Sequence, residues 1–286
     1  MKRTTVIILA VILLVMALCI IAYPWISNYL NDRYQSMILT EYEKDVEVLD
    51  DAKVQDAVQA AHAYNENLSP IRYDREAIEA ASFSYEELLN LHGSGLIGYV
   101  EIPKIDVNLP IYHGTSEEVL QTGIGHLMGS SFPVGGNGSH AVLTGHSGVA
   151  GKRLFSDLDQ LAPGDMFFLH VLGDTLAYQV VAINTVLPYE TDLLLADPDQ
   201  DLCTLVTCTP YGVNSHRLLV RGSRVAYEEA TEEIPGTTEE PTRSTWKGNY
   251  LKGLAVGGIA ALGAVFVGML VLTVIKKQKR RRRDEG

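Results

Sequence analysis

Residues 201–222, DLCTLVTCTPYGVNSHRLLVRG, contain two neighbouring segments that determine the fold. The segments DLCTLVTC and RLLVRG are short and rich in Val, Leu and Thr, which is typical of β-strands. The residues Thr-Pro-Tyr-Gly at 209–212 end the first segment, because Pro and Gly favour turns. We therefore predict two strands, with Cys208 at the end of the first and Arg217 at the start of the second.

The spacing of the cysteines predicts a free thiol. Cys203 and Cys208 are five residues apart in one predicted strand, so they point to opposite faces and lie roughly 17 Å apart at about 3.4 Å per residue. A disulfide needs Cα atoms within about 7 Å of each other, so we expect no bridge. Cys203, in the middle of the strand, is expected to be a small buried hydrophobe. Cys208, at the strand end, is the candidate nucleophile.

A thiolate nucleophile needs a base or a positive group nearby, and two histidines have a suitable setting. His146 follows the apolar run at 141–144 and is flanked by Gly145 and Gly148, which predicts an uncrowded side chain at a strand end. His126, in the stretch GIGHL, has a similar setting. The spacing favours His146 and leaves His126 as the second candidate.

Arg217 and Arg221 are the candidate cations for the same site. If the two predicted strands lie side by side, Arg217 lies opposite Cys208, where its guanidinium can donate hydrogen bonds to a developing oxyanion or to a substrate carbonyl. Arg221 lies two steps further along the same face and competes for this role. The alternative is that both arginines pair with carboxylates of an acidic surface.

The charge of the chain is unevenly distributed. The net charge is −12, yet residues 1–26 and 276–286 together hold nine positive and two negative charges, which leaves −19 for the rest. A body this acidic repels phosphate backbones, so we expect no nucleic-acid partner. The basic residues adjoin apolar runs at both ends, a pattern that indicates a membrane.

Two runs of 23 residues, 4–26 and 253–275, contain no charged side chain. At 1.5 Å per residue, each helix would be roughly 34 Å long, enough for a hydrocarbon core of about 30 Å. The alternative for the first run is a cleaved signal peptide, but the run is long and no Ala-x-Ala site follows it. Positive flanks stay on the cytoplasmic side. We therefore expect a two-pass membrane protein whose residues 27–252 lie outside the cell.

The external part has three sections. Apolar residues recur at three- and four-residue steps from Asn28 to about Asn65, which predicts one or two helices with a break near Asp50. Short β-rich runs with Gly and Pro turns follow over residues 93–227 and predict a closed or sandwiched β domain. Residues 231–249 are rich in Thr, Glu and Pro and resemble a tether.

Three stretches carry a resemblance to a known family. TLVTCTPYGVNSHRLLVRG, residues 204–222, closely resembles the signature of sortases, especially the pilus-building class C. Residues 98–115, GYVEIPKIDVNLPIYHGT, resemble the first strands of that fold. Residues 123–148, GIGHLMGSSFPVGGNGSHAVLTGHSG, resemble the segment that ends in the sortase histidine. The resemblance covers most of residues 93–226 and selects His146 and Arg217 over their competitors.

The resemblance implies a mainly β fold: a sortase-like eight-stranded β-barrel with short helices, preceded by a helical region and flanked by two transmembrane helices. The expected domains are an N-terminal anchor (1–26), an extracellular helical region with a possible lid (27–92), the catalytic β-barrel (93–227), a tether (228–252), a transmembrane helix (253–275) and a basic cytoplasmic tail (276–286).

The implied activity is that of a cysteine transpeptidase on the outer face of a Gram-positive membrane. Cys208 would attack the threonine carbonyl of an LPxTG-like sorting signal, on a pilin or surface protein, and form a thioester. His146 would protonate the departing amine and later deprotonate the incoming one, and Arg217 would hold the oxyanion or the signal backbone. Thr207 would assist the substrate contacts. The acceptor would be a pilin lysine or a cell-wall peptide amine, and the resemblance implies no metal or organic cofactor.

One class C feature is missing from the sequence. Class C sortases often have a lid with an Asp-Pro-aromatic motif, but no such tripeptide precedes the predicted barrel, where Asp74 and Phe83 are the nearest candidates. We therefore expect an open or differently closed site. Three other functions stay open: a housekeeping sortase, a non-catalytic membrane-tethered binding module, and a peptidoglycan-crosslinking cysteine transpeptidase of unrelated fold, suggested by residues 113–115.

Overall fold

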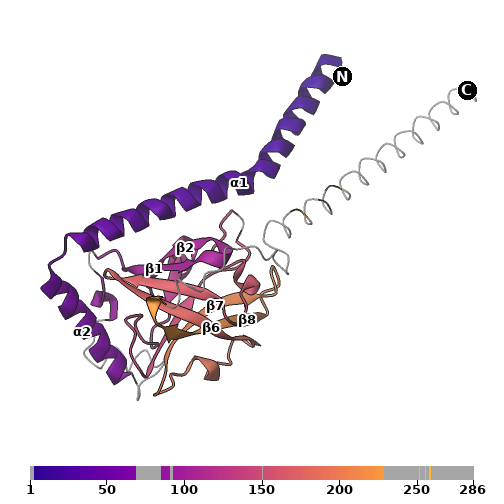
Figure 1. Ribbon diagram of the computed structural model, residues 1–286. Coiled ribbons are helices and arrows are strands. Elements are labelled where there is room, and N and C mark those ends of the chain that lie inside the picture. The colour runs from indigo at the N-terminus through magenta and orange to yellow at the C-terminus, as the bar shows by residue number, and fades with distance from the viewer. Residues whose placement is uncertain are drawn as a thin grey trace, which may run out of the picture. The chain divides into compact units, whose positions relative to one another are not determined.

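The computed structural model describes residues 3–68, 85–90, 93–149 and 151–228, together with the single positions 251, 255 and 258 (Figure 1). The chain divides into two compact units, Met1–Arg243 and Ser244–Gly286. The predicted lid residues Asp74 and Phe83 lie outside the described residues. Nearly all of the predicted tether, the second apolar run and the basic tail also lie outside them.

Two helices begin the chain (Figure 1): α1 spans Arg3–Glu47 and α2 spans Asp51–Asn67. The break predicted near Asp50 is confirmed, because the Asp50 side chain accepts a hydrogen bond from Ala52 N at 3.1 Å and so caps α2. Residues 4–26 and the predicted helical region from Asn28 belong to one continuous helix. Proline removes only one backbone donor, and α1 continues through Pro24, whose carbonyl accepts a hydrogen bond of 2.8 Å from Asn28 Nδ2.

Among the residues that the structure describes, no helix is long and apolar enough to span a membrane. The two membrane segments inferred from the sequence, residues 1–26 and 253–275, therefore stay predictions.

The predicted β domain is a closed barrel of eight strands in the order β1-β2-β3-β4-β7-β8-β6-β5. The eight-stranded barrel that the resemblance implies is thus confirmed, although the three-residue β3 was not among the predicted strands. The strands are β1 Leu96–Ile102, β2 Val107–His113, β3 Ile124–His126, β4 Ser139–Thr144, β5 Met166–Val171, β6 Asp174–Val186, β7 Asp201–Thr209 and β8 His216–Val225.

In the described part of the chain, five short helices connect or precede these strands. They are the α-helix α4, Glu117–Thr122, and the 3-10 helices η1 Tyr85–Glu87, η2 Pro103–Ile105, η3 Leu158–Gln160 and η4 Asp192–Leu194. Alternate residues of the strands point into the barrel, where Ile111, Leu143, Phe167, Leu205 and Val220 are fully excluded from solvent. The outward residues of β4, β7 and β8 are therefore the ones left to form a site.

Helix α1 is fixed to the barrel by side-chain hydrogen bonds. Tyr42 Oη donates to Ile97 O at 2.9 Å and accepts from Leu172 N at 2.9 Å, so one hydroxyl contacts both β1 and the β5–β6 turn. Burial raises the pKa of Tyr42 to about 12, so this hydroxyl keeps its proton and can donate. At the other end of the contact, Ser27 Oγ donates to Gly151 O at 3.1 Å.

Candidate active site

The strand pair β7–β8 places Cys208 directly opposite Arg217. The two strands are antiparallel, and their register pairs Cys208 with Arg217 and Thr204 with Arg221. The prediction that Arg217 lies opposite the thiol is therefore confirmed. Cys208 is partly exposed, whereas Cys203 is fully buried, and neither forms a disulfide. Burial raises the pKa of Cys203 well above its usual range, which makes it an inert core residue, as predicted.

The strand pair β4–β7 brings His146 to the same edge of the barrel. These strands are parallel, and the register pairs Ser139 with Asp201 and Thr144 with Val206. Beyond β4 the pairing continues, because Gly145 N donates to Val206 O at 3.0 Å. Two residues after Thr144 comes His146, and two residues after Val206 comes Cys208. If the loop keeps this register for two more residues, His146 comes next to Cys208.

Thr207 connects these two segments. Its side chain is 3% exposed, and its hydroxyl donates to Gly145 O at 2.7 Å. The hydroxyl thus ties the residue before Cys208 to the residue before His146. The contact with substrate that the resemblance implies for Thr207 stays a prediction. What the structure adds is a contact between the two halves of the site.

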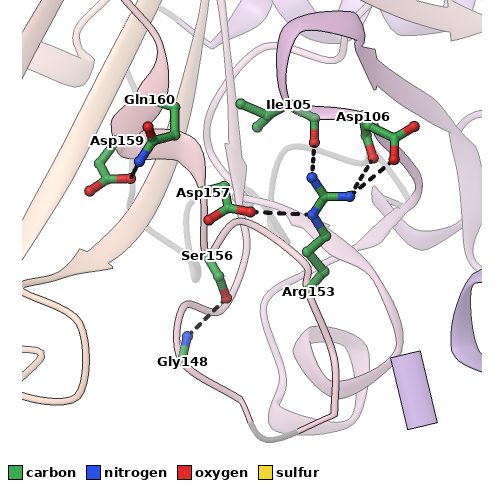
Figure 2. Close-up of polar contacts among 8 residues, drawn as sticks. All are labelled: Ile105, Asp106, Gly148, Arg153, Ser156, Asp157, Asp159 and Gln160. Carbon is green, nitrogen blue, oxygen red and sulfur yellow. Dashed lines mark hydrogen bonds and ion pairs between the residues drawn. The ribbon is translucent and has the colours of Figure 1, made fainter. Parts of the chain in front are cut away.

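The loop after His146 is held by a backbone hydrogen bond and by the side chain of Arg153. Phe155 N donates to His146 O at 3.1 Å. Figure 2 shows the clamp, in which the Arg153 guanidinium donates to Ile105 O at 2.5 Å, to Asp106 Oδ2 at 3.1 Å and to Asp157 Oδ2 at 3.3 Å. The Asp157 side chain is only 3% exposed. This network joins Arg153, in the loop after His146, to the η2 turn and to Asp157.

The two competing residues have structural roles. His126 is fully buried, with Nδ1 2.9 Å from Tyr85 Oη and Nε2 2.9 Å from Ser131 O. Its burial lowers the pKa to about 4, so it is an uncharged packing residue. Arg221 Nη2 donates to Leu193 O, which holds the β6–β7 loop against the barrel. Both competitors are thus occupied away from Cys208.

Arg217 is held by backbone carbonyls at the end of the β7–β8 turn. Its Nη1 donates to His216 O at 3.1 Å and to Asn214 O at 3.3 Å. Neither Arg217 nor Arg221 forms an ion pair with any carboxylate in the described part of the chain, so the expected alternative of surface pairing is not observed. The Arg217 guanidinium is thus held by two backbone carbonyls, on the residue that pairs with Cys208 in the strand register.

A small buried apolar cluster lies on the outer side of the barrel near Cys208. Outward residues of β4, β7 and β8 form this cluster, which is separate from the core and includes Val142, Val206 and Leu219. Leu194 of η4 is part of the cluster and is itself buried. Because Val206 and Cys208 are two residues apart on the same face of β7, the thiol lies next to the cluster. In the described residues, no group of three His, Cys, Asp or Glu could hold a metal ion.

Two residues near the site were not found from the sequence. Glu117 Oε2 lies 3.4 Å from His146 Nε2. Tyr211, in the β7–β8 turn, lies against Gly148, since a Cβ at Gly148 would be 3.6 Å from its ring. No spacing signal could have identified either, because α4 and the β7–β8 turn approach the His146 loop only in the folded barrel.

Comparison with known proteins places this geometry in a family. Residues 100–225 match the sortase domain model. Sortase C1 of Streptococcus agalactiae is 44% identical with a TM-score of 0.64, over 66% of this chain and 98% of that chain. Sortase C of Streptococcus pneumoniae is 42% identical with a TM-score of 0.59, over 67% and 97%. Sortase C of Clostridium perfringens is 40% identical with a TM-score of 0.58, over 67% and 99%.

A closed eight-stranded barrel with a partly exposed thiol opposite an arginine is compatible with a cysteine-dependent acyl-transfer enzyme. The chain belongs to the sortase family, and it is a sortase-type transpeptidase whose structural neighbours are class C sortases. The alternatives of an unrelated transpeptidase fold, suggested by residues 113–115, and of a non-catalytic binding module are therefore wrong. His113 instead contacts Gly95 O at 2.9 Å and Leu88 O at 2.7 Å through its two ring nitrogens.

Proposed function

We propose that this sortase cleaves an LPxTG-like sorting signal after its threonine and transfers the threonine acyl group to an amine, with a pilin lysine as the acceptor. The observation that carries the proposal is the register of β4, β7 and β8, in which Cys208 pairs with Arg217 and β4, which ends two residues before His146, runs parallel to β7. Support for a pilin substrate comes from the similarity to class C sortases, among them the pneumococcal sortase C whose pilin substrate specificity has been described.

The proposed chemistry divides among three residues. The Cys208 thiolate attacks the threonine carbonyl carbon, and the negative charge that develops on the oxygen is stabilised by the Arg217 guanidinium. The carbon–nitrogen bond then breaks, His146 gives its proton to the departing glycine amine, and a thioester remains. In the second half, the acceptor amine attacks the thioester and loses a proton to His146. The new amide forms as the Cys208 thiolate leaves.

The apolar cluster beside Cys208 is not itself a free surface for a signal, because Val142, Val206 and Leu194 are buried. Support for the proposed signal comes instead from a related structure. The related sortase C of C. perfringens was solved with the C-terminal cell wall sorting motif, which supports the same class of ligand.

We further propose that the chain is a two-pass membrane protein whose barrel lies outside the cell. The support is the pair of uncharged runs at residues 4–26 and 253–275 with positive residues on their outer flanks. Ser27, the first residue after the N-terminal run, contacts Gly151 of the loop that follows His146. On this proposal the active site lies close to the membrane surface.

Intact-mass analysis of the full chain in detergent, incubated with an LPxTG-type peptide, tests the chemistry. We expect an adduct of the peptide truncated after threonine in the wild type and in Cys203→Ala, and none in Cys208→Ala. Addition of a pilin domain with a free lysine, or of a cell-wall peptide amine, then shows which acceptor releases the adduct faster. An unmodified mass with every signal peptide tried, while Cys208 still reacts with iodoacetamide, would refute the proposed substrate.

A further inference from the structure

Nε2 of the His146 ring faces the carboxylate of Glu117. This nitrogen is shielded from solvent and makes no hydrogen bond within the described part of the chain, although the side chain as a whole is 24% exposed. Glu117 Oε2 lies 3.4 Å from it, within reach of an ion pair. A shielded imidazole nitrogen with a single carboxylate in front of it is an orienting contact.

The Glu117 carboxylate is itself held in this direction. Gln121, one helical turn later in α4, donates from Nε2 to Glu117 Oε1 at 2.7 Å, so Oε2 is left to face His146. This hydrogen bond, followed by smaller contributions from His146, lowers the pKa of Glu117 below its usual range. The carboxylate is therefore ionised at neutral pH.

Helix α4 is braced from both sides of the site. Lys152, in the loop that follows His146, donates from Nζ to Gln121 O. On the opposite side, Gln35 of α1 donates from Nε2 to Thr122 O at 3.4 Å. These two contacts hold α4 in place next to the His146 loop. Glu117, in the first turn of α4, is therefore held near His146 although its side chain is exposed.

We propose that Glu117 is a positioning residue for His146, holding the ring through Nε2 and stabilising the positive charge that the ring carries while it keeps the proton of Cys208. This inference rests on the proposed function and deepens it. With the N–H kept on Nε2 by the carboxylate, Nδ1 is the nitrogen that exchanges a proton with the thiol and the amines. The contact is 72% exposed at the glutamate, so its effect is modest and sensitive to salt.

The test uses alkylation of Cys208, which requires no sorting signal. The second-order rate with iodoacetamide is followed in the full chain at the Cys208 peptide by mass spectrometry, at neutral pH and low salt. Because an exposed ion pair has a small effect, Glu117→Gln should react about 1.4- to 5-fold more slowly than the wild type. In about 1 M NaCl, where the Debye length is about 3 Å, this difference should disappear.

Glu118→Gln is the matched control. Glu118 occupies the same first turn of α4 and is exposed, so its substitution removes the same charge from the same helix end without a contact to His146. Equal rates for Glu117→Gln and Glu118→Gln, or a difference that persists in high salt, would overturn the proposal. Because alkylation and peptide-adduct formation are separate readouts, a missing adduct would refute the sortase substrate and leave the role of Glu117 standing.

Discussion

The hydroxyl of Thr207 offers the sharpest test of how the two halves of the site are joined. Thr207→Val keeps the shape of the buried side chain and removes only the donor to Gly145 O. A buried carbonyl that loses its donor costs about 1–3 kcal/mol, so we expect the free energy of unfolding to fall by that amount. Because Gly145 precedes His146, we also expect the rate of peptide acylation at Cys208 to fall about 10-fold or more.

Thr207→Ser is the matched control, because it keeps the hydroxyl and loses a methyl group, which costs about 1 kcal/mol in stability. Urea unfolding gives the stability of each variant, and the adduct rate measured by intact mass gives the acylation. If the hydrogen bond positions His146, the serine variant acylates within about twofold of the wild type although it is destabilised. Acylation by Thr207→Val as fast as by Thr207→Ser would refute the reasoning.

Three further predictions concern the site and its supports. Arg217→Gln should slow acylation, measured by adduct formation, by about 10²–10³-fold. Arg217→Lys keeps the charge but not the planar guanidinium, so it should slow acylation less. Equal losses in the two variants would contradict the oxyanion role. Arg153→Ala should lower unfolding stability by about 3 kcal/mol, since the buried Asp157 loses a guanidinium partner, whereas Asp106→Asn, at a side chain 94% exposed, should leave the urea midpoint unchanged. His126 takes up its proton in the unfolded chain near pH 6.5 but in the folded chain only near pH 4. The free energy of unfolding therefore has its full value above pH 6.5 and falls by up to about 3 kcal/mol as the pH drops to about 4. The loss of stability between pH 7 and pH 4.5 should therefore be smaller in His126→Gln than in the wild type, and equal losses would show that His126 is not kept neutral by burial.

Much of the barrel could be predicted from local patterns, because strands such as β4 and β7 combine Val and Leu with nearby turn residues. The position of Cys208 opposite Arg217 could also be predicted, since a single turn joins the two residues. β3 could not, because a strand of three residues has no periodicity to detect. The continuity of α1 from the N-terminal run into the helical region was not addressed by the sequence patterns, because a lone proline is a probable helix end and not a certain one.

The choice between His146 and His126 shows where residue spacing stops being informative. Both follow short apolar stretches next to glycine, and only the burial of His126 against Tyr85 and Phe132 separates them. That burial depends on Tyr85 of η1, which lies 41 residues before His126 in the sequence. Glu117 was missed for a related reason, because its role depends on where α4 lies and not on its neighbours in the sequence.

The parallel pairing of β4 with β7 has a consequence for the newly made chain. Two whole strands, β5 and β6, separate these partners in the sequence, so His146 meets Cys208 only after a long-range closure, and such contacts form late in folding. A chain that is still being synthesised or is only half folded carries a thiol without its base. On the proposed chemistry, such a chain cannot acylate itself or its neighbours, so the topology delays the onset of reactivity until the barrel is complete.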